Sequence, residues 1–408
     1  MNQGLKRMFG LLRSGNWLDG HRMMAWSGIL LTFEILVFVF FVAGTHGYII
    51  RLEKPITTDF VSFYAAGSLT NSGHPSLVYS QPDHYEAEQA ATAPGIEYVF
   101  FFYPPVFLML CSLLARLPYL LSFLVFETAS CLLYLLVIRQ ILNERGWRWL
   151  LPVMAFPAVF WVVGVGQNSF LTAAFFGAAT LLLDRRPAMA GLAFGLLCYK
   201  PHFGLLIPIA LAAGRHWRAF VAANVSVAVL VVLSALLFGL EPWRAFLMTF
   251  ITSSAVFAEG RVPFAGLVSV FAAARILGLS AGSAYLIQAA VTATVAVTVG
   301  AIWYRDGPPS VRFASLIAGT LLAVPVVLFY DLLLLAVAGC WLTQAGRSRG
   351  FLTWEITVLA GTFLVPLLSR SWGIGFAIPI GPLAALAVLG LCCIRSGMAG
   401  LVKAQKMP

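Results

Sequence analysis

The chain has 408 residues, of which 60% are hydrophobic and only 10% are charged. A soluble domain of average composition is about half apolar and about a quarter charged, so this composition excludes an ordinary soluble protein. The 26 Lys and Arg residues outnumber the 16 Asp and Glu residues and give a formal charge of +10. Because the positive residues fall between apolar runs, they indicate contact with lipid headgroups and not with nucleic acid.

The cysteines and the N-terminal residues carry little chemistry. All six cysteines lie within apolar runs and at no metal-ligand spacing, so neither disulfides nor a zinc site is expected. About 22 mostly polar residues precede the first apolar run, and no small-residue cleavage site follows it. We therefore expect no cleavable signal peptide.

The apolar runs predict an all-α polytopic membrane protein. A full crossing needs about 20 residues, and some segments fall short of that length. With these shorter segments included, about twelve transmembrane helices are expected in a single transmembrane domain over residues 1–408. They lie near residues 25–45, 119–138, 149–165, 169–183, 188–199, 203–213, 219–239, 282–303, 313–329, 332–344, 352–368 and 374–394.

The distribution of Lys and Arg predicts that both termini are cytoplasmic. With the N-terminus inside, 18 of the 26 positive residues fall on the cytoplasmic side, Lys406 among them. Residues 103–116 are apolar enough to suggest one more span, but a crossing there would turn Arg139, Arg145 and Arg148 outward. We therefore predict that 103–116 is a short helix in the outer interface, begun by two prolines.

Two long external segments interrupt the series of spans, at residues 46–118 and 240–281. The first is predicted to contain amphipathic helices near 57–71 and 81–92, in addition to 103–116. The second is predicted to contain helices near 243–257 and 264–277. A membrane anchor needs no such segments, so the asymmetry favours a reaction chamber roofed by interfacial helices.

The fifth and sixth predicted spans form a short hairpin. Between Arg186 and Arg215 the chain rises and returns within 28 residues, turning at Tyr199-Lys200-Pro201-His202. Each arm is about 18 Å long at helical rise, whereas the hydrocarbon layer is about 30 Å thick. Lys200 is therefore predicted to lie below the outer surface in a cavity, because a bare ammonium in lipid is costly. The alternative is a single tilted helix kinked at Pro201.

Three short motifs bring polar side chains to the outer side. Asp59 follows the first span, with Tyr64 one turn later, and could also be an ordinary acid at a helix N-terminus. Gly166-Gln167-Asn168 is typical of a turn, and its two amides could hydrogen-bond sugar hydroxyls. Tyr330-Asp331 ends a later span. Asp331 either caps the following helix or faces the cavity of Lys200.

The remaining external charged residues are assigned weaker roles. Arg261, Arg275 and Arg370 could hold a phosphate, although lipid contact is the more usual role of such residues. The external histidines show no ligand spacing on one helix face, so no metal is expected. Three acids are interpreted as one solvated helix surface and fit a base role less well: Asp83, Glu86 and Glu88.

Two acids lie near the middle of predicted spans, and they support an alternative function. Glu34 and Glu127 could form a proton relay, which would suit a proton-coupled transporter or a flippase for lipid-linked glycans. The other interpretation is a protonated carboxyl hydrogen-bonded between helices. No P-loop or dinucleotide-binding motif is present, so no nucleotide cofactor is expected. Because an external site would also lack nucleotide sugars, the substrates are expected to be lipid-linked.

The order of these motifs resembles glycosyltransferase family 87, polyprenyl-phosphate-sugar-dependent mannosyltransferases and relatives with the GT-C fold. The similar stretches extend over residues 57–331, and they are Asp59-Phe60, Phe102-Tyr103-Pro104-Pro105, Gly166-Gln167-Asn168, Ala190-Gly191-Leu192 through Tyr199-Lys200-Pro201, and Tyr330-Asp331. The resemblance implies a GT-C-like fold, an outward-facing cavity, an aspartate base in the first external loop, inversion at the anomeric carbon and no metal.

Transferred to this sequence, the resemblance implies that Asp59 is the catalytic base, with Asp331 as second candidate. Together with the residues considered above for their position and charge, the expected substrate-binding residues are Tyr64, Tyr103, Gln167, Asn168, Lys200, His202, Arg261, Tyr330 and Asp331, with Lys200 on the donor phosphate and His202 close by. The expected reaction moves mannose or a similar hexose or pentose from a polyprenyl-phosphate-sugar to a lipid or glycan acceptor, without a cofactor. The expected location is the outer face of the inner (plasma) membrane, among membrane lipids. A polymerase or ligase acting on lipid-linked glycans is a further possibility.

Overall fold

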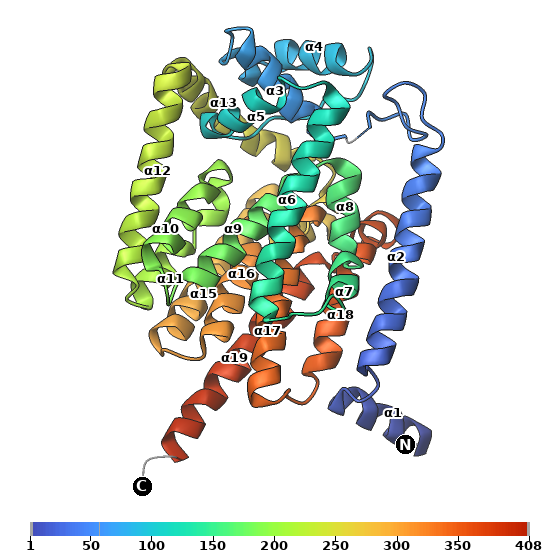
Figure 1. Cartoon of the computed structure of the whole chain (residues 1–408), viewed down its shortest axis with the longest axis vertical. Coiled ribbons are helices and arrows are strands. Elements are labelled where there is room, and N and C mark those ends of the chain that lie inside the picture. Colours follow the sequence, from blue (N-terminus) through green and yellow to red (C-terminus); the bar gives the residue numbers. More distant parts are fainter. Residues whose placement is uncertain (1–2, 57, 406–408) are drawn as a thin grey trace.

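The computed structural model describes residues 3–56 and 58–405, so Thr57 and Lys406 lie outside the described residues. Within these residues the regular elements are helices, and the only strand-like pairings are isolated bridges such as that between Leu267 and Leu328. Figure 1 shows a helical bundle with both ends of the chain at its lower end. The predicted fold class, an all-α polytopic membrane protein, is confirmed.

The bundle and the structure above it are made of different helices. The bundle helices are α2 (Gly20–Val42), α6 (Tyr119–Leu142), α7 (Leu150–Met154), α8 (Pro157–Val165), α9 (Ser169–Leu182), α10 (Pro187–Gly195), α11 (Ile207–Ala213), α12 (Trp217–Phe238), α15 (Ala281–Tyr304), α16 (Pro309–Ala323), α17 (Leu334–Arg349), α18 (Glu355–Phe376) and α19 (Gly381–Gln405). The upper helices are α3 (Phe60–Asn71), α4 (Gln81–Ala91), α5 (Leu108–Leu114) and α13 (Glu241–Ala258). We call these four, with the segments that join the first three, the cap.

Several short elements complete the chain. Helix α1 (Gln3–Ser14) lies at the lower end, and α14 (Val270–Ile276) follows the cap helix α13. The 3-10 turns are η1 (Leu77–Tyr79), η2 (Pro105–Phe107), η3 (Leu196–Tyr199), η4 (Pro201–Gly204), η5 (Phe264–Gly266) and η6 (Phe329–Leu333). In the described part of the chain, six helical segments are long and apolar enough to cross a membrane: α2, α6, α12, α15, α18 and the η6–α17 segment.

The other six predicted spans are shorter or interrupted, and prolines account for two of the interruptions. The predicted span 149–165 is divided into α7 and α8, and α8 begins at Pro157. The predicted span 313–329 is wrong in its second half, because α16 ends at Ala323 and an extended Val324 precedes Pro325. Proline cannot continue a helix and disfavours helical backbone at the residue before it. The extended stretch leads the chain into η6.

The predicted short hairpin is confirmed. The arms are α10 with η3 and η4 with α11, and Lys200 lies between the two 3-10 turns. Pro187 begins the first arm and Arg215 follows the second, and both residues line the same groove. The chain therefore returns to the side of the bundle from which the hairpin started. The alternative of one tilted helix kinked at Pro201 is therefore wrong.

Contacts at the lower end connect segments that the sequence analysis assigned to the cytoplasmic side. Trp354 N donates to Arg13 O at 2.7 Å, Arg347 pairs with Glu144 at 2.6 Å, and Arg312 lies 3.8 Å from Asp184. Residues 103–116, in contrast, form η2 and α5 in the cap beside α3. The prediction that this stretch does not cross the bundle is confirmed.

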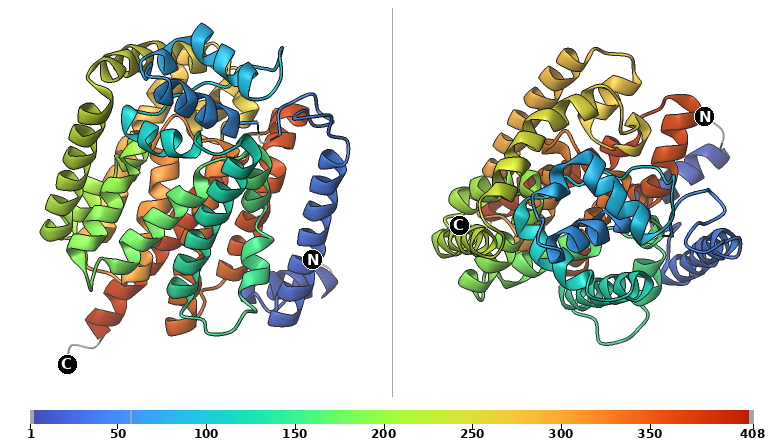
Figure 2. Two further views of the ribbon diagram at one scale, coloured as in Figure 1. Left: turned by 45° about the horizontal axis from the view of Figure 1, so that its top comes forward. Right: turned by 90° about the horizontal axis from the view of Figure 1, so that it is seen from above.

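The cap is more deeply buried than predicted. Phe60, Val61, Phe63 and Ala65 are at most 1% exposed, and four positions so close in sequence point to several sides of the helix. The prediction of an amphipathic helix near 57–71 is therefore wrong. Helix α3 is buried on several sides because α4 and α5 pack against it. Gly67 allows this packing, since a Cβ there would lie 2.0 Å from the carbonyl oxygen of Cys111. Seen from above, the cap covers the centre of the bundle (Figure 2).

The prediction of a solvated acidic surface on α4 is wrong for Glu88. Its side chain is fully buried, accepts a hydrogen bond from Val99 N at 3.1 Å and faces the equally buried His84 at 3.6 Å. Burial raises the pKa of Glu88 to about 8, and the charge of Asp59 adds to the rise. Burial also lowers the pKa of His84 to about 4, so both side chains are neutral in mildly acidic solution.

Candidate functional site

Asp59 lies where the start of α3 meets the end of α8. Its backbone N–H donates to Val165 O at 2.8 Å, which joins the two elements. Asp59 stands at the N-cap position of α3, but its side chain makes no capping hydrogen bond. Instead, one carboxylate oxygen (Oδ2) accepts a hydrogen bond from Nε2 of Gln167 at 2.8 Å. Asp59 is therefore an acid at a helix N-terminus whose carboxylate is held by a side chain of another element and not by a capping hydrogen bond.

The Gly166-Gln167-Asn168 turn directs the Gln167 amide at Asp59. Gly166 ends α8 with φ 68° and ψ 50°, a left-handed conformation that glycine adopts without steric cost. The Gln167 oxygen accepts from Asn168 N at 3.1 Å and from the Tyr103 hydroxyl at 3.3 Å. Two donors on the oxygen leave the NH₂ group of Gln167 oriented toward the carboxylate.

The environment of Asp59 suits a general base. Burial raises the pKa of its carboxyl from 3.8 to about 6. The hydrogen bond from Gln167 opposes this rise, and so do the charges of Lys54, Arg370 and Lys200. A carboxyl with this pKa is mostly ionised at neutral pH and accepts a proton more readily than an ordinary aspartate does.

Lys200 and Asp331 form a buried ion pair. The Lys200 ammonium lies 2.8 Å from Oδ1 of Asp331, and both side chains are at most 4% exposed. The same oxygen accepts from the Ser169 hydroxyl at 3.0 Å, and Oδ2 accepts from Leu328 N at 3.2 Å. Of the two positions expected for Asp331, the one facing Lys200 is present, because Asp331 is the counter-ion of the Lys200 ammonium. Asp331 does not cap a helix starting at 332, since it lies inside η6.

Two tyrosines connect Asp59 with the ion pair. The hydroxyls of Tyr103 and Tyr330 each lie within electrostatic range of both Asp59 and Asp331. The Tyr330 ring also lies 5.6 Å from the Lys200 ammonium. The predicted residues Asp59, Tyr103, Lys200, Tyr330 and Asp331 therefore form one cluster between the cap and the bundle.

Several polar groups in this cluster have capacity for a ligand. Asn168 is fully buried, and its amide lies beside the Tyr103 hydroxyl but makes no hydrogen bond of good geometry among the described residues. His202 lies within electrostatic range of Lys200 and Asp331 and remains exposed. Lys200 has three N–H donors, and among the described residues Asp331 is its one hydrogen-bond acceptor. Buried amides without partners are costly, so a polar ligand or water would stabilise this region.

Arg370 adds a second cation, which sequence reasoning did not distinguish from other external arginines. It lies 5.3 Å from the Phe329 ring and 5.9 Å from the Trp161 ring, and its charge acts on Asp59. No acid pairs with it in the part of the chain that the structure describes. The sequence also gave no role to Ser169 or Thr172, although both follow the Asn168 turn. Thr172 shares a 2.7 Å hydrogen bond with the Tyr199 hydroxyl.

Two predicted binding residues have their contacts outside this cluster. The Tyr64 hydroxyl donates to Leu117 O at 3.0 Å, inside the cap. Arg261 pairs with Glu259 at 2.8 Å and lines a separate cavity. Arg275, considered for phosphate binding, donates to Leu279 O and Ala258 O and so holds a loop together.

The two acids of the transporter hypothesis are buried in the spans α2 and α6. Glu34 is 4% exposed and Glu127 is 6% exposed. Both carboxylate oxygens of Glu127 and one of Glu34 have no hydrogen-bond partner among the described residues. The alternative interpretation, a carboxyl hydrogen-bonded between helices, is therefore wrong for Glu127. Across residues 3–56 and 58–405, no three His, Cys, Asp or Glu side chains gather as a metal site would require.

One comparison with known proteins gives a match. A family model described as "Glycosyltransferase family 87" matches residues 101–330, which is more than half of the chain. The match includes Tyr103, Gln167, Asn168, Lys200 and Tyr330, whereas Asp59 and Asp331 lie outside it. No curated protein and no solved structure matches the chain.

Proposed function

Because the chain belongs to glycosyltransferase family 87, and is therefore a membrane glycosyltransferase, we propose that its donor is a polyprenyl-phosphate-sugar. The observation that carries the proposal is the arrangement around Asp59. A carboxylate suited to proton transfer lies in one cluster with two cations, Lys200 and Arg370. Transfer from a phosphate ester needs these two functions, a base for the acceptor and positive charge for the leaving phosphate.

The proposed step is a single displacement. An acceptor hydroxyl gives its proton to the carboxylate of Asp59 as its oxygen bonds to the anomeric carbon. The bond from that carbon to the phosphate oxygen breaks, and its electron pair leaves with the polyprenyl phosphate. Attack opposite the leaving group inverts the anomeric configuration. Lys200 and Arg370 stabilise the departing phosphate, while Gln167 and Asn168 contact sugar hydroxyls.

The depth of the cluster suits a donor that stays in the membrane. Lys200 lies at the turn of a hairpin whose arms are shorter than the hydrocarbon layer, so a phosphate can reach it while the prenyl chain remains in lipid. By the positive-inside rule, this end of the bundle faces the outside. We therefore propose an inner (plasma) membrane enzyme that acts on its outer face, without nucleotide or metal.

The proposed substrates are a hexose or pentose such as mannose and a lipid or glycan acceptor. A transporter or flippase using Glu34 and Glu127 is the alternative, and the family match favours the transferase. The two acids lie in the spans α2 and α6, and neither makes a hydrogen bond or ion pair with a described residue of the polar cluster.

The function is tested by reconstituting the purified protein in liposomes with radiolabelled polyprenyl-phosphate sugars and a mixed membrane lipid extract. We expect one donor to lose its sugar to a lipid product, and nucleotide sugars to give none. Asp59→Asn should abolish this transfer, whereas Glu34→Gln with Glu127→Gln should retain it. Transfer from a nucleotide sugar alone would contradict the proposed donor. Movement of the intact labelled donor across the bilayer without sugar transfer, lost in the Glu34 and Glu127 variant, would favour the alternative.

A further inference from the structure

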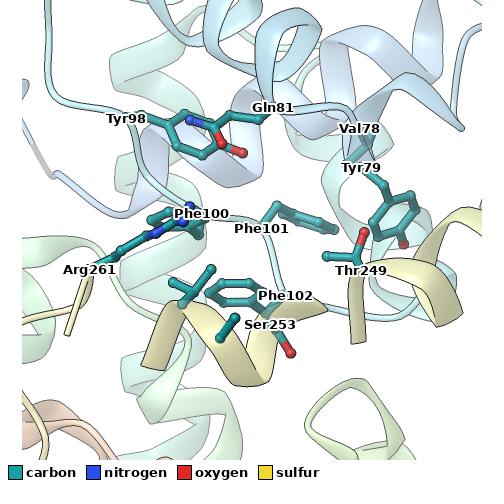
Figure 3. A pocket seen from close by; sticks show the side chains of 12 residues that line it. Val78, Tyr79, Gln81, Tyr98, Phe100, Phe101, Phe102, Thr249, Ser253 and Arg261 are labelled. Atoms are coloured by element: carbon teal, nitrogen blue, oxygen red, sulfur yellow. The ribbon is translucent and has the colours of Figure 1, made fainter. Parts of the chain in front are cut away.

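A cavity lies where the two long external segments meet, and Figure 3 shows its side chains. Its volume is about 260 Å³. One wall is residues 98–102, another is η1 with the start of α4, and the third is α13 with the loop that follows it. Among the residues proposed above for substrate binding, Arg261 alone lines it.

The cavity combines flat aromatic surfaces with polar groups. The rings of Phe100 and Phe102 are stacked 5.3 Å apart, with 8° between their planes, and Tyr98 packs edge-on against Phe100 at 4.9 Å. Gln81 and Arg261 add an amide and a guanidinium to the lining. Figure 3 shows Gln81 beside Tyr98, and Arg261 alongside Phe100.

A short series of contacts leads from this cavity to Asp59. The hydroxyl of Tyr79, which lines the cavity, donates to Tyr103 O at 2.9 Å. The ring of Phe101, also in the lining, lies 5.4 Å from the Tyr103 ring. Tyr103 in turn donates to Gln167, which holds the carboxylate of Asp59. The cavity is therefore a neighbour of the proposed reaction centre on the side of the cap.

We propose that this cavity binds a sugar residue of the acceptor, so that the acceptor is a glycan or a glycolipid headgroup. This inference rests on the proposed function and adds the class of acceptor to it. A sugar ring has an apolar C–H face, which packs on aromatic rings, and a rim of hydroxyls, which bond to amides and guanidinium groups.

The composition and size of the cavity argue against other ligands. A prenyl chain would bury the Gln81 amide and the Tyr98 hydroxyl without supplying hydrogen bonds, at an energetic cost. A phosphate would find one cation, Arg261, already paired with Glu259. Pockets for drug-sized molecules span about 300–1,000 Å³, so the smaller volume here suits one sugar residue at the end of an acceptor.

Sugar binding can be measured by saturation-transfer difference NMR on the full-length protein in lipid nanodiscs. The probes are the methyl glycosides of mannose, glucose and galactose. We expect at least one probe to receive saturation from the protein. Phe100→Ala and Gln81→Ala should each lower this signal at least about three-fold, because each removes one face of the cavity. Gln81 is exposed, so its variant tests the cavity without disturbing the core.

Matched controls locate the signal. Phe351→Ala changes an aromatic residue that is 41% exposed and lies on the α17–α18 loop at the lower end, and Glu86→Ala changes an exposed residue on the same helix as Gln81. Both should retain the signal. The proposal is overturned by no saturation of any probe in the wild type. It is equally overturned by a signal that survives Phe100→Ala and Gln81→Ala.

A failure of this inference can be distinguished from a failure of the proposed function. Asp59→Asn leaves the cavity intact, so sugar binding should persist while transfer stops. A wild-type protein that binds the glycosides in the cavity but releases no sugar from any polyprenyl-phosphate donor would keep this inference and remove the proposed function. If the wild-type protein transfers sugar but Phe100→Ala binds the probes as well as the wild type does, the proposed function is kept and this inference is removed.

Discussion

The two aspartates of the cluster differ in how many of their oxygens are already engaged. Asp331 accepts three hydrogen bonds, one of them from the ammonium of Lys200. Among the described residues Asp59 accepts one from an amide, and burial raises its pKa to about 6. A carboxylate saturated with donors is a poor proton acceptor. The proton-transfer role therefore suits Asp59, and a role in holding Lys200 suits Asp331.

Replacing Asp59 by asparagine tests this assignment. The variant keeps the shape of the side chain but cannot accept the acceptor proton, so transfer should fall by about 10²–10⁴-fold. Donor binding should change little, because the cations are untouched. The measurement is sugar transfer in liposomes, with binding of the labelled donor determined in parallel. A variant with near wild-type turnover would move the base elsewhere, and Asp331→Asn would then be examined.

The raised pKa of Asp59 predicts the pH dependence of transfer. Only the ionised carboxylate accepts a proton, so kcat/KM should rise with pH. The midpoint of the rise should lie at about 6, the pKa of Asp59, and the rate should level off above it. An unperturbed aspartate would place this midpoint near about 4. The check is a pH profile of the initial rate at low donor concentration. A profile that is flat from pH 5 to 8 would rule out titration of Asp59 as the controlling step.

The Lys200–Asp331 pair predicts that single and double variants differ. Lys200→Gln leaves Asp331 charged and buried, and the loss of one partner in a buried pair costs about 3–5 kcal/mol. Lys200→Gln combined with Asp331→Asn removes both charges and should unfold at a higher temperature than either single variant. If Lys200 contacts the donor phosphate, the double variant should still bind the donor about ten-fold more weakly than wild type. Wild-type donor affinity in the folded double variant would leave Lys200 a structural role only.

Individual site residues could be predicted from the sequence where they belong to a short local motif. Gln167 was identified from a turn of three residues, and its hydrogen bond to Asp59 is present. The approach of Asp331 to Lys200 could be predicted only as one of two alternatives, because the two are 131 residues apart and no local pattern connects them. Glu88 was misassigned for a related reason: its sequence neighbours are polar, and its burial depends on how the chain packs around α4.

At the scale of elements, the hairpin of α10 and α11 could be predicted because helix length and membrane thickness are both fixed quantities. What the arms pack against could not. Helix α10 packs against α12, and Gly191 and Gly195 form that contact. A Cβ at Gly195 would lie 2.4 Å from Cβ of Ser226 and 2.8 Å from the carbonyl oxygen of Ala223. Close approach of two helices at small residues is a common means of packing in membranes.

Gly195→Ala should therefore push α10 away from α12 and displace the turn that holds Lys200. Overpacking costs about 1–3 kcal/mol, so we expect a lower unfolding temperature and weaker donor binding. Gly282→Ala on α15 is the matched control, because a Cβ there meets nothing within 4 Å. Equal unfolding temperatures for the two variants would show that α10 and α12 are not tightly packed at this point.

For the whole molecule, the distribution of Lys and Arg predicts which side of the membrane each end of the bundle faces. The end that holds α1 and the α17–α18 loop carries most of the positive residues and should face the cytoplasm. The cap should then face outward, because residues 103–116 lie within it and do not reverse the direction of the later helices. The outward location of the Asp59 cluster, and with it the lipid-linked donor, depends on this orientation.

Single cysteines in a background without the six native ones test the orientation. Glu86→Cys in the cap and Ser371→Cys near the upper end of α18 should react with a membrane-impermeant maleimide added to right-side-out vesicles. Arg186→Cys and Ser348→Cys should react only after the vesicles are made permeable. All four side chains are exposed, so accessibility to the reagent depends on the side of the membrane. Labelling of Arg186→Cys in intact vesicles, with Glu86→Cys protected, would place the cluster in the cytoplasm. A nucleotide sugar could then reach it, and the argument for a lipid-linked donor would lose its basis.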